Sequence, residues 1–586
     1  MGQSPDSTLF RFLQQNSTYR WTNLIRYAGE FQGLSYRLSN SFQSTMNEIG
    51  GGERQWKDDQ RFHGTLSGDL YRSWDWEMQG NLIWFNDEQS GYFNDSRAAS
   101  GGFGVRRDFR KGLVQFGGAY KQEIRRRYVD TGPTLSGRVQ LEQQDLGGYI
   151  TSGRVNAEHE WLGDRINSTY LTRWDIRRQF APGVSDHLTV DLGYRKRSYY
   201  LANGVIEDRN ESQQQVGNEL RYRIGQQMEW RYDLEFTRRS THIETPMPSI
   251  ATTVLKDRGN YDLHNQLHLL LRLGAVQSRS FIRYRVQQNL YDTQAEDTLV
   301  SAVQARLRSP PNDNSNTFEL GTDVGFRLAE RDSLELSARI VQLRYNTPDT
   351  TNFDDRDEIR HRYRIRYSHL FAPGFSYQAE GDVTLGHYAY LFQERSAENY
   401  WNRIFRLSNI VLWERGPWYL RTKGEVVANY YDYDYDDLLG QVRSLVFRHL
   451  ILQQIVRHSI WNRWDGQLRV ELQLEDQGRL DWDEFLAELI LERETVEYEY
   501  RIGLPVGRTW EGYAGYRYQR RLDWQISPQS RELSERLVTQ GPIFQLMYTR
   551  RQNPVITWEG AFLRVQQLNG ETYPITQLRL QAHWLW

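Results

Sequence analysis

The chain has 586 residues, a formal net charge of −2, a mean hydropathy of −0.75 and no cysteine. The balanced charge argues against nucleic-acid binding through a basic excess. The missing cysteines exclude disulfides, thiolate metal sites, a cysteine nucleophile and covalent haem attachment to this chain. No cofactor is therefore expected on the chain itself, and haem is expected only through a partner.

Aromatic residues reach 13% although hydrophobic residues make up only 38% of the chain. Large amphipathic rings in an otherwise polar chain suit a membrane–water boundary. No run approaches the 18 or more apolar residues of a membrane helix. The first residues lack a basic-then-apolar signal segment, so an exported protein is expected to be present here in its mature form.

Residues 1–16 carry no clear pattern and are expected to form an N-terminal segment ahead of the folded part. From residue 17 onward, apolar and polar residues alternate in runs of about ten to fourteen, which is the period of a half-buried β-strand. The first two runs show this through Tyr19, Trp21, Ile25 and Tyr27, and then through Leu34, Tyr36, Leu38 and Phe42. Tight turns and longer polar stretches separate the runs.

The same alternation recurs to the end of the chain, for example in Trp74 to Trp84, Leu220 to Phe236 and Leu334 to Ile340. Thirteen tight turns are predicted near residues 29, 72, 108, 145, 181, 226, 276, 330, 373, 415, 465, 506 and 552. The longer stretches 47–60, 238–260 and 291–316 are expected to be polar loops. A short helix is an alternative for residues 481–494.

Thirteen turns, spaced by about 44 residues, predict an all-β, single transmembrane antiparallel barrel over residues 17–586, with about 26 strands and a range of 24 to 28. A β-propeller has a similar repeat length and is the soluble alternative. Propeller blades need four short strands in each repeat, whereas here each repeat holds two long ones. Nothing remains in the chain to cover the apolar face, so lipid is expected to cover it.

The polar face carries arginines and acids. Arg360, Arg362, Arg364 and Arg366 alternate along one predicted strand, and we call them the arginine ladder. Solvation and cross-strand pairing explain such residues in a water-filled barrel. The alternative is a surface complementary to a molecule in the lumen, because the planar guanidinium binds carboxylates bidentately.

Two acidic stretches are weaker candidates. Residues 430–437 alternate Tyr with Asp, and oxygen ligands at alternate positions can hold calcium. More often such a stretch is an aromatic belt that runs into a solvated acidic loop. Asp354, Asp355, Asp357 and Glu358 invite the same two interpretations with less support. The twelve histidines are scattered, and no Ser/His/acid set, phosphate loop or dinucleotide fingerprint is found. The chain is therefore not expected to be an enzyme.

The last strand, residues 577–586, places Leu578, Leu580, Ala582, Trp584 and Trp586 on one face. This end resembles the C-terminal signature of bacterial outer-membrane β-barrel proteins, whose final strand carries the insertion signal. That family typically ends in Phe, so Trp586 departs from it while keeping the aromatic character. The resemblance implies an outer-membrane location, a role for Trp584 and Trp586 in insertion, and contact with the barrel-assembly machinery and lipid.

No segment that plugs the pore is expected ahead of the barrel, so its own long loops or another protein should close it. In size the chain resembles two families. The lipopolysaccharide-insertion barrel has an N-terminal soluble domain and cysteines that this chain lacks. The barrel subunit of porin–cytochrome electron conduits also resembles this chain in its polar lumen, although the cysteine pair of some conduit barrels is absent. No specific motif carries this second resemblance.

Three functions remain open: a sheath for an inserted partner such as a multihaem cytochrome, a stand-alone diffusion porin, and an exporter of a polymer or protein. In each of them the tight turns and both chain ends, or at least the C-terminus, are expected to face the periplasm, and the longer loops are expected to face the outside.

Overall fold

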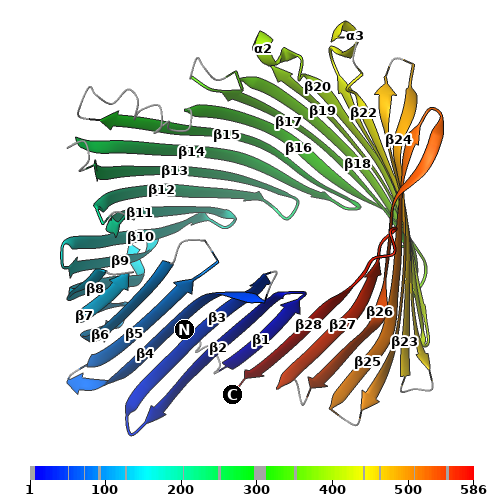
Figure 1. Cartoon of the computed structure of the whole chain (residues 1–586). Helices are drawn as coiled ribbons and strands as arrows, with labels where there is room; N and C mark the ends of the chain where they lie inside the picture. The colour runs from blue at the N-terminus through cyan, green and yellow to red at the C-terminus, as the bar shows by residue number, and fades with distance from the viewer. Residues whose placement is uncertain are drawn as a thin grey trace.

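The computed structural model describes residues 7–49, 52–71, 73–89, 94–125, 128–201, 204–247, 252–295, 312–348, 353–439, 442–460, 464–482, 484–506, 509–549 and 554–585. One antiparallel sheet of 28 strands contains almost all of them, and strands adjacent in sequence are adjacent in space. Figure 1 shows the sheet curling round until its first and last strands meet.

The strands are β1 (Ser7–Gln15), β2 (Thr18–Phe31), β3 (Leu34–Ile49), β4 (Glu53–Tyr71), β5 (Trp74–Asp87), β6 (Asn94–Phe109), β7 (Gly112–Arg125), β8 (Tyr128–Leu146), β9 (Tyr149–Leu162), β10 (Arg165–Ala181), β11 (Val184–Tyr200), β12 (Ile206–Ile224), β13 (Met228–Met247), β14 (Thr252–Leu273), β15 (Val276–Ala295), β16 (Asp313–Ala329), β17 (Asp332–Asn346), β18 (Arg356–Ala372), β19 (Phe375–Tyr390), β20 (Tyr400–Arg415), β21 (Trp418–Tyr433), β22 (Leu445–Ile460), β23 (Trp464–Asp481), β24 (Leu486–Val506), β25 (Trp510–Ser527), β26 (Ser530–Thr549), β27 (Val555–Gln566) and β28 (Thr572–Leu585). Two short helices, α2 (Gln393–Ser396) and α3 (Asp436–Leu439), lie between strands at one end of the barrel.

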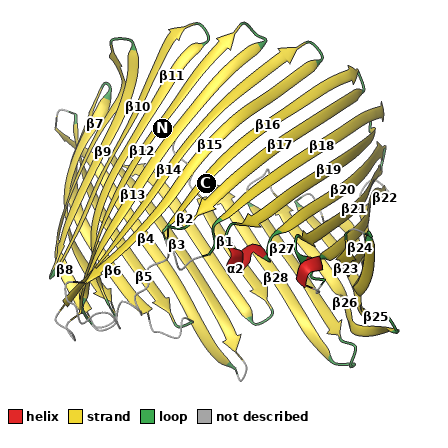
Figure 2. Ribbon diagram, turned by 90° about the horizontal axis from the view of Figure 1, so that it is seen from above, coloured by secondary structure: helices red, strands yellow, loops and turns green. Residues whose placement is uncertain are grey.

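The barrel closes through β1 and β28, which pair antiparallel from Ser7 opposite Leu585 to Gln15 opposite Gln577. Closure gives every described strand a hydrogen-bonded neighbour on each side, as a sheet in hydrocarbon requires. The expected all-β barrel is confirmed, and its 28 strands lie at the upper end of the predicted range. Figure 2 shows the strands running at a steep tilt around the barrel.

Strand parity assigns every connection to one of the two ends of the barrel. The thirteen connections that begin with β2–β3 and end with β26–β27 contain two to five residues each, and they lie at the same end as Ser7 and Leu585. These connections match the thirteen predicted turns. The thirteen turns join β2 to β27 in pairs. The other two strands are β1, which begins at this edge, and β28, which ends at it, so neither takes part in a turn here. We call this edge the turn end and the opposite edge the loop end.

The first strand corrects the predicted N-terminal boundary. Residues 7–15 form β1 and belong to the barrel, although residues 1–16 were expected to precede it. Phe10 and Phe12 project from the same face of this strand, and Phe12 lies against Trp21 of β2, with ring centroids 5.5 Å apart. The segment was missed because its four apolar residues come in two adjacent pairs, Leu9–Phe10 and Phe12–Leu13, and do not alternate with polar ones.

Two of the expected polar loops are also largely strand. Residues 34–49 and 53–71 pair with each other through most of the stretch 47–60, and β13 and β14 occupy most of the stretch 238–260. The third expected loop, 291–316, begins and ends in β15 and β16, and its residues 296–311 lie outside the described ranges. Residues 486–506 form β24, so the helical alternative for 481–494 is wrong.

These strands are longer than a membrane requires. A tilted strand crosses the hydrocarbon with about 9–11 residues, whereas β14 has 22. On β13 the positions that face outward near the turn end are Trp230, Tyr232, Leu234 and Phe236, and those toward the loop end are Arg238, Ser240, His242 and Glu244. On β13 the outward apolar residues therefore lie in the half near the turn end, and the other half of the strand extends beyond them. Among the described residues there is no helix long and apolar enough to cross a membrane.

Candidate functional site

The inner face of the barrel follows from the pairing of the strands. Residues directly opposite each other in an antiparallel pair project from the same side of the sheet. Tyr363 and Ile365 of β18 are exposed apolar residues and occupy the lipid-facing phase. The alternate residues of β18, which include the arginine ladder, therefore face the lumen.

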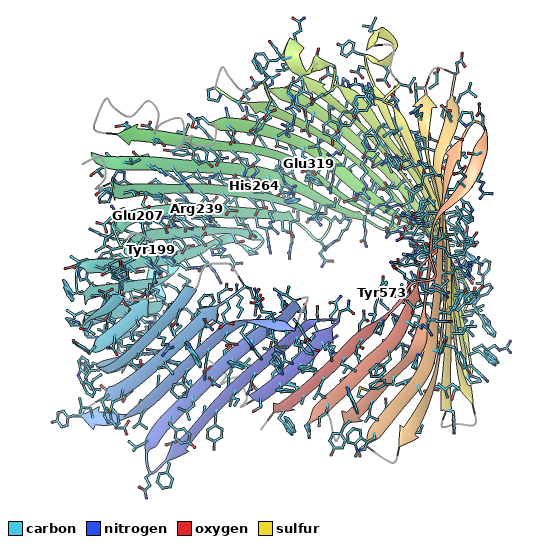
Figure 3. All side chains as sticks on the ribbon, in the orientation of Figure 1. Tyr199, Glu207, Arg239, His264, Glu319 and Tyr573 are labelled. Carbon is cyan, nitrogen blue, oxygen red and sulfur yellow. The ribbon has the colours of Figure 1, made fainter. Side chains whose placement is uncertain are left out.

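The inner-facing positions can be followed from strand to strand around the wall. Glu319 of β16 stands opposite Val341 of β17, which in turn stands opposite Arg360 of β18. Figure 3 draws all described side chains and labels six on this inner phase: Tyr199, Glu207, Arg239, His264, Glu319 and Tyr573. The drawn side chains line the barrel and leave its middle open.

Ion pairs between neighbouring strands cover much of the inner face. Glu319 accepts from Arg283 at 2.6 Å and lies 3.2 Å from Nε of Arg339, so one acid joins three strands. Glu499 of β24 pairs with Arg501 on its own strand at 2.7 Å and with Arg517 of β25 at 2.6 Å. Such pairs keep long side chains ordered along a water-filled interior.

The arginine ladder divides into paired and unpaired members. Nε of Arg362 donates to Asp382 at 2.8 Å, and Arg366 binds both Glu380 at 2.7 Å and Glu335 at 3.1 Å. Arg360 donates to the hydroxyl of Tyr388 at 2.8 Å and pairs with no acid among the described residues. Arg364 forms no hydrogen bond or ion pair with any described residue. The cross-strand pairing interpretation therefore holds for half of the ladder.

Further inner-facing arginines also lack an acidic partner within the described ranges. Arg406 of β20 lies opposite Asp382, which Arg362 already occupies. On the far side of the β1–β28 closure, Arg20, Arg26 and Arg37 face the lumen from β2 and β3 without a bonded partner among the described residues. Positive charge thus remains available to a molecule inside the barrel.

A group of tyrosines near the loop end of the lumen was not recognised in the sequence. Tyr388, Tyr400 and Tyr433 stand opposite one another on β19, β20 and β21, and Tyr431 lies two residues from Tyr433 on the same face. Tyr345 and Tyr390 flank Arg356 in the neighbouring row. We call these six residues the tyrosine wall. They are separated by up to 88 residues in sequence, so only the strand register brings them together.

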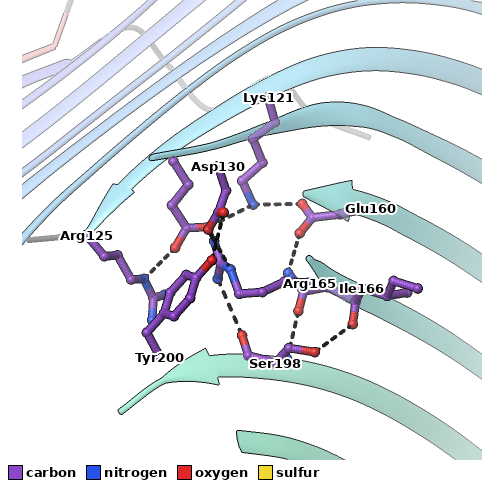
Figure 4. Close-up of polar contacts among 10 residues, drawn as sticks. Lys121, Arg125, Asp130, Glu160, Arg165, Ile166, Ser198 and Tyr200 are labelled. Atoms are coloured by element: carbon purple, nitrogen blue, oxygen red, sulfur yellow. Dashed lines mark hydrogen bonds and ion pairs between the residues drawn. The ribbon is translucent and has the colours of Figure 1, made fainter. Parts of the chain in front are cut away.

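A second unrecognised cluster surrounds Arg165, the first residue of β10. Its guanidinium lies 2.6 Å from Asp130 and 3.3 Å from Glu123, and its side chain is only 2% exposed. Tyr200 donates to Asp130 at 2.9 Å and stacks on Tyr128 with ring centroids 4.2 Å apart. Figure 4 shows these contacts together with the adjacent Lys121–Glu160 pair, in which nitrogen and oxygen are 2.7 Å apart. Every charge at the centre of this cluster is paired, which assigns it a structural role.

The calcium interpretation of the acidic stretches gains no support. Asp432 pairs with Arg403 at 2.7 Å, Asp434 with His387 at 2.9 Å and Asp436 with Arg443 at 3.3 Å. Within the residues that the structure describes, no group of three or more His, Asp or Glu side chains is arranged to hold a metal ion.

The described residues at the C-terminal end project from the face that the sequence predicted. Trp584 stands opposite Thr8 in the closure, on the same face as Leu580 and Ala582. Trp586 lies outside the described residues. The role of both tryptophans in insertion stays a prediction.

Comparison with known proteins gives no family model that matches and no curated protein that matches. Solved structures do match in fold. The copper transporter OprC is 9% identical with a TM-score of 0.41, over 92% of this chain and 85% of that chain. The outer-membrane transporter YddB from Escherichia coli is 8% identical with a TM-score of 0.39, over 92% and 84%. The siderophore receptor PirA from Pseudomonas aeruginosa is 8% identical with a TM-score of 0.39, over 96% and 86%. At this similarity, none of their ligands carries over to this chain.

The location follows from the barrel itself. A closed antiparallel barrel with an even number of strands, here 28, and an outward apolar band is the architecture of bacterial outer-membrane proteins. The protein is an integral outer-membrane β-barrel. The expectation that it is not an enzyme and its resemblance to conduit barrels stay predictions.

Proposed function

We propose that the barrel is a wide outer-membrane conduit that sheathes a partner protein in its lumen, with a multihaem cytochrome as the expected partner. One observation carries the proposal: the inner wall of a closed 28-stranded barrel presents arginines that lack an acidic partner among the described residues. Guanidinium groups are weakly hydrated and bind carboxylates bidentately, so they suit a protein surface or haem propionates.

The size of the barrel is compatible with such a partner. Strands about 4.8 Å apart and tilted by about 40° each occupy about 6.3 Å of perimeter. A circular ring of 28 such strands is roughly 55 Å across, with roughly 40 Å between the inner side chains. A folded domain of about 100 residues has a radius of gyration of about 13 Å and a diameter of roughly 34 Å. A small folded protein therefore fits.

In this arrangement the barrel performs no redox chemistry. Its polar inner wall holds the partner, and its closed, hydrogen-bonded sheet separates the partner from lipid. For a cytochrome, the consequence is a row of haems that crosses the membrane inside an insulating wall.

The test is purification of the full chain from its own cells in mild detergent, followed by subunit stoichiometry and an absorbance scan for haem. A stoichiometric second polypeptide with a haem spectrum is expected. Arg364→Gln should reduce the amount of partner retained. Barrel assembly should stay intact, because Arg364 is bonded to no acid in the described structure and its substitution leaves none unpaired. Neutralising Arg362 and Arg366 as well should reduce retention further, although Asp382 and Glu380 then lose their partners.

A colourless barrel that carries no second protein and conducts steadily in planar bilayers would overturn the proposal. A stand-alone diffusion porin would then be the better interpretation. Export of a polymer or protein would require transport across the membrane by the isolated barrel.

A further inference from the structure

We infer that the tyrosine wall, together with Arg360, Arg364 and Arg406, is a docking surface for an acidic polypeptide inside the lumen. The inference deepens the proposed function, because it assigns the partner's contact to one sector of the inner wall, β17 to β21 near the loop end.

Lipid does not explain these tyrosines. Membrane barrels carry aromatic girdles on their outer face, at the two water interfaces. The tyrosine wall lies on the inner face. Tyr388 of β19 stands directly opposite Glu358 of β18, which projects from the same side as the arginine ladder. The lipid-facing side of β18 holds Tyr363 and Ile365. A lumen filled only with water gains nothing from six aromatic rings on this wall.

Four of the six rings contact one another. Tyr388 and Tyr400 stack with centroids 4.7 Å apart and planes at 15°. Tyr400 also contacts Tyr431 at 5.8 Å and Tyr433 at 5.6 Å. Tyr400 is therefore the centre of the surface, in contact with three of the other five rings.

Arginines from the adjoining strand and connections hold the outer rings in place. The guanidinium carbon of Arg356 lies 4.7 Å from the ring centroid of Tyr345, that of Arg395 lies 4.2 Å from Tyr390, and that of Arg443 lies 4.6 Å from Tyr433. Cation–π contacts of this kind order both side chains before any partner arrives. A surface ordered in advance loses less conformational entropy when it binds.

The surface has unused hydrogen-bonding capacity. Of the six hydroxyls, only that of Tyr388 is hydrogen-bonded to a described residue, and its donor is Arg360. The other five hydroxyls form no hydrogen bond within the described ranges; they belong to Tyr345, Tyr390, Tyr400, Tyr431 and Tyr433. These five residues are only partly buried. Tyrosine combines a large rigid contact area with a polar group, and with arginine it is enriched among the residues that dominate protein–protein binding.

The charge of the sector indicates an acidic partner. Arg356 is balanced by Glu358 at 2.8 Å and Arg362 by Asp382 at 2.8 Å. The guanidinium groups of Arg360, Arg364 and Arg406 have no such acid in the described structure. Arg360 bonds the hydroxyl of Tyr388, and Arg364 and Arg406 stand on the same inner face further toward the turn end, so three positive charges lie on the wall that carries the rings. Carboxylates of a polypeptide complement them, and its backbone and side chains suit the tyrosines.

The test measures binding of fluorescent poly-L-glutamate to the purified full-chain barrel in nanodiscs, with poly-L-lysine and neutral dextran of similar length as comparisons. Arg360→Gln, Arg364→Gln and Arg406→Gln together should weaken poly-L-glutamate binding about tenfold or more. The matched control is Arg20→Gln, Arg26→Gln and Arg37→Gln, which removes the same charge from inner positions without adjoining tyrosines. This control should weaken binding clearly less than the wall variants do, because it leaves the tyrosine wall and its three arginines intact.

A second pair of variants tests the rings. Tyr400→Leu should weaken binding several-fold, whereas Tyr573→Leu, on the inner phase of β28, should leave it unchanged. Equal losses in the wall and control variants would overturn the inference in favour of general lumen charge. Dextran binding that depends on Tyr400 would overturn it in favour of a carbohydrate.

The two proposals fail separately. A barrel that purifies without a second polypeptide contradicts the proposed sheath, and it leaves the poly-L-glutamate result standing. A partner that is retained by the barrel but released equally by wall and control variants contradicts only the docking surface.

Discussion

Arg165 donates through Nε to Oδ2 of Asp130 at 2.7 Å, and both side chains are almost wholly removed from solvent, with 2% and 8% exposed. Removing one partner of a buried ion pair leaves an uncompensated charge and costs about 3–5 kcal/mol. We therefore expect Arg165→Gln to lower the free energy of unfolding of the barrel by about this amount. Urea unfolding in lipid vesicles, followed by heat-modifiable gel mobility, measures the change.

The matched control is the exposed pair of Arg61 and Asp59, whose side chains are 67% and 35% exposed. Arg61→Gln should cost about 0–1 kcal/mol, because water already solvates both charges. Equal unfolding midpoints for the Arg165 and Arg61 variants would contradict the structural role assigned to the Arg165 cluster.

The closure of the barrel can be tested with cysteines, since the chain has none of its own. Arg11 and Gln581 stand directly opposite each other on the inner face of β1 and β28. Opposite residues of an antiparallel pair lie within the Cα separation that a disulfide spans. Arg11→Cys with Gln581→Cys should therefore cross-link on oxidation and change the mobility of the denatured chain.

Arg11→Cys with Gln577→Cys is the corresponding mismatch. Gln577 pairs with Gln15, four residues further along β1, so the two thiols are roughly 13 Å apart. Cross-linking of the mismatched pair in preference to the matched one would show a different register at the closure.

Removal of residues 584–586 should prevent insertion into the outer membrane, since the last strand then loses its aromatic end and its pairing with Thr8 and Ser7. The truncated chain is expected to be periplasmic and degraded, as shown by cell fractionation and immunoblotting. His583→Ala, on the inner phase, is the control and should insert normally. A truncated chain that still gives a heat-modifiable barrel would contradict the insertion role of Trp584 and Trp586.

Labelling of single cysteines in intact cells tests the orientation of the barrel in the membrane. Glu330 lies in the β16–β17 turn at the turn end, and Asn569 lies in the β27–β28 connection at the loop end. A membrane-impermeant maleimide should label Asn569→Cys in intact cells and Glu330→Cys only after permeabilisation. The opposite pattern would place the turn end, and with it both chain ends, outside.

The sequence predicted the turn end of the barrel well because two signals coincide there. Outward apolar residues alternate with inward polar ones, and glycines mark several turns, such as Gly374 with φ 80° and Gly416 with φ 58°. A positive φ is favourable for glycine and is costly for most other residues.

The loop end was predicted less well because the first of these signals disappears there. Beyond the apolar band both faces of a strand meet water, so stretches such as Arg238 to Glu244 carry polar residues at every outward position and look like loops. The tyrosine wall needs the strand register in addition. Tyr431 and Tyr433 were noted as part of an alternating Tyr/Asp stretch, but Tyr345, Tyr388 and Tyr400 join them only through pairing across neighbouring strands.

The order of the strands also has a consequence for assembly. In this barrel 27 of the pairings join strands that follow each other in the chain, and only the pairing of β1 with β28 joins residues more than 560 positions apart. Local hairpins form quickly, whereas a contact between distant segments requires closing a large loop and is slow. The nascent barrel can therefore grow hairpin by hairpin as an open sheet, and the single slow step is its closure. Until that step, β1 must stay available for pairing, and any factor that protects its free edge protects the whole chain from aggregation.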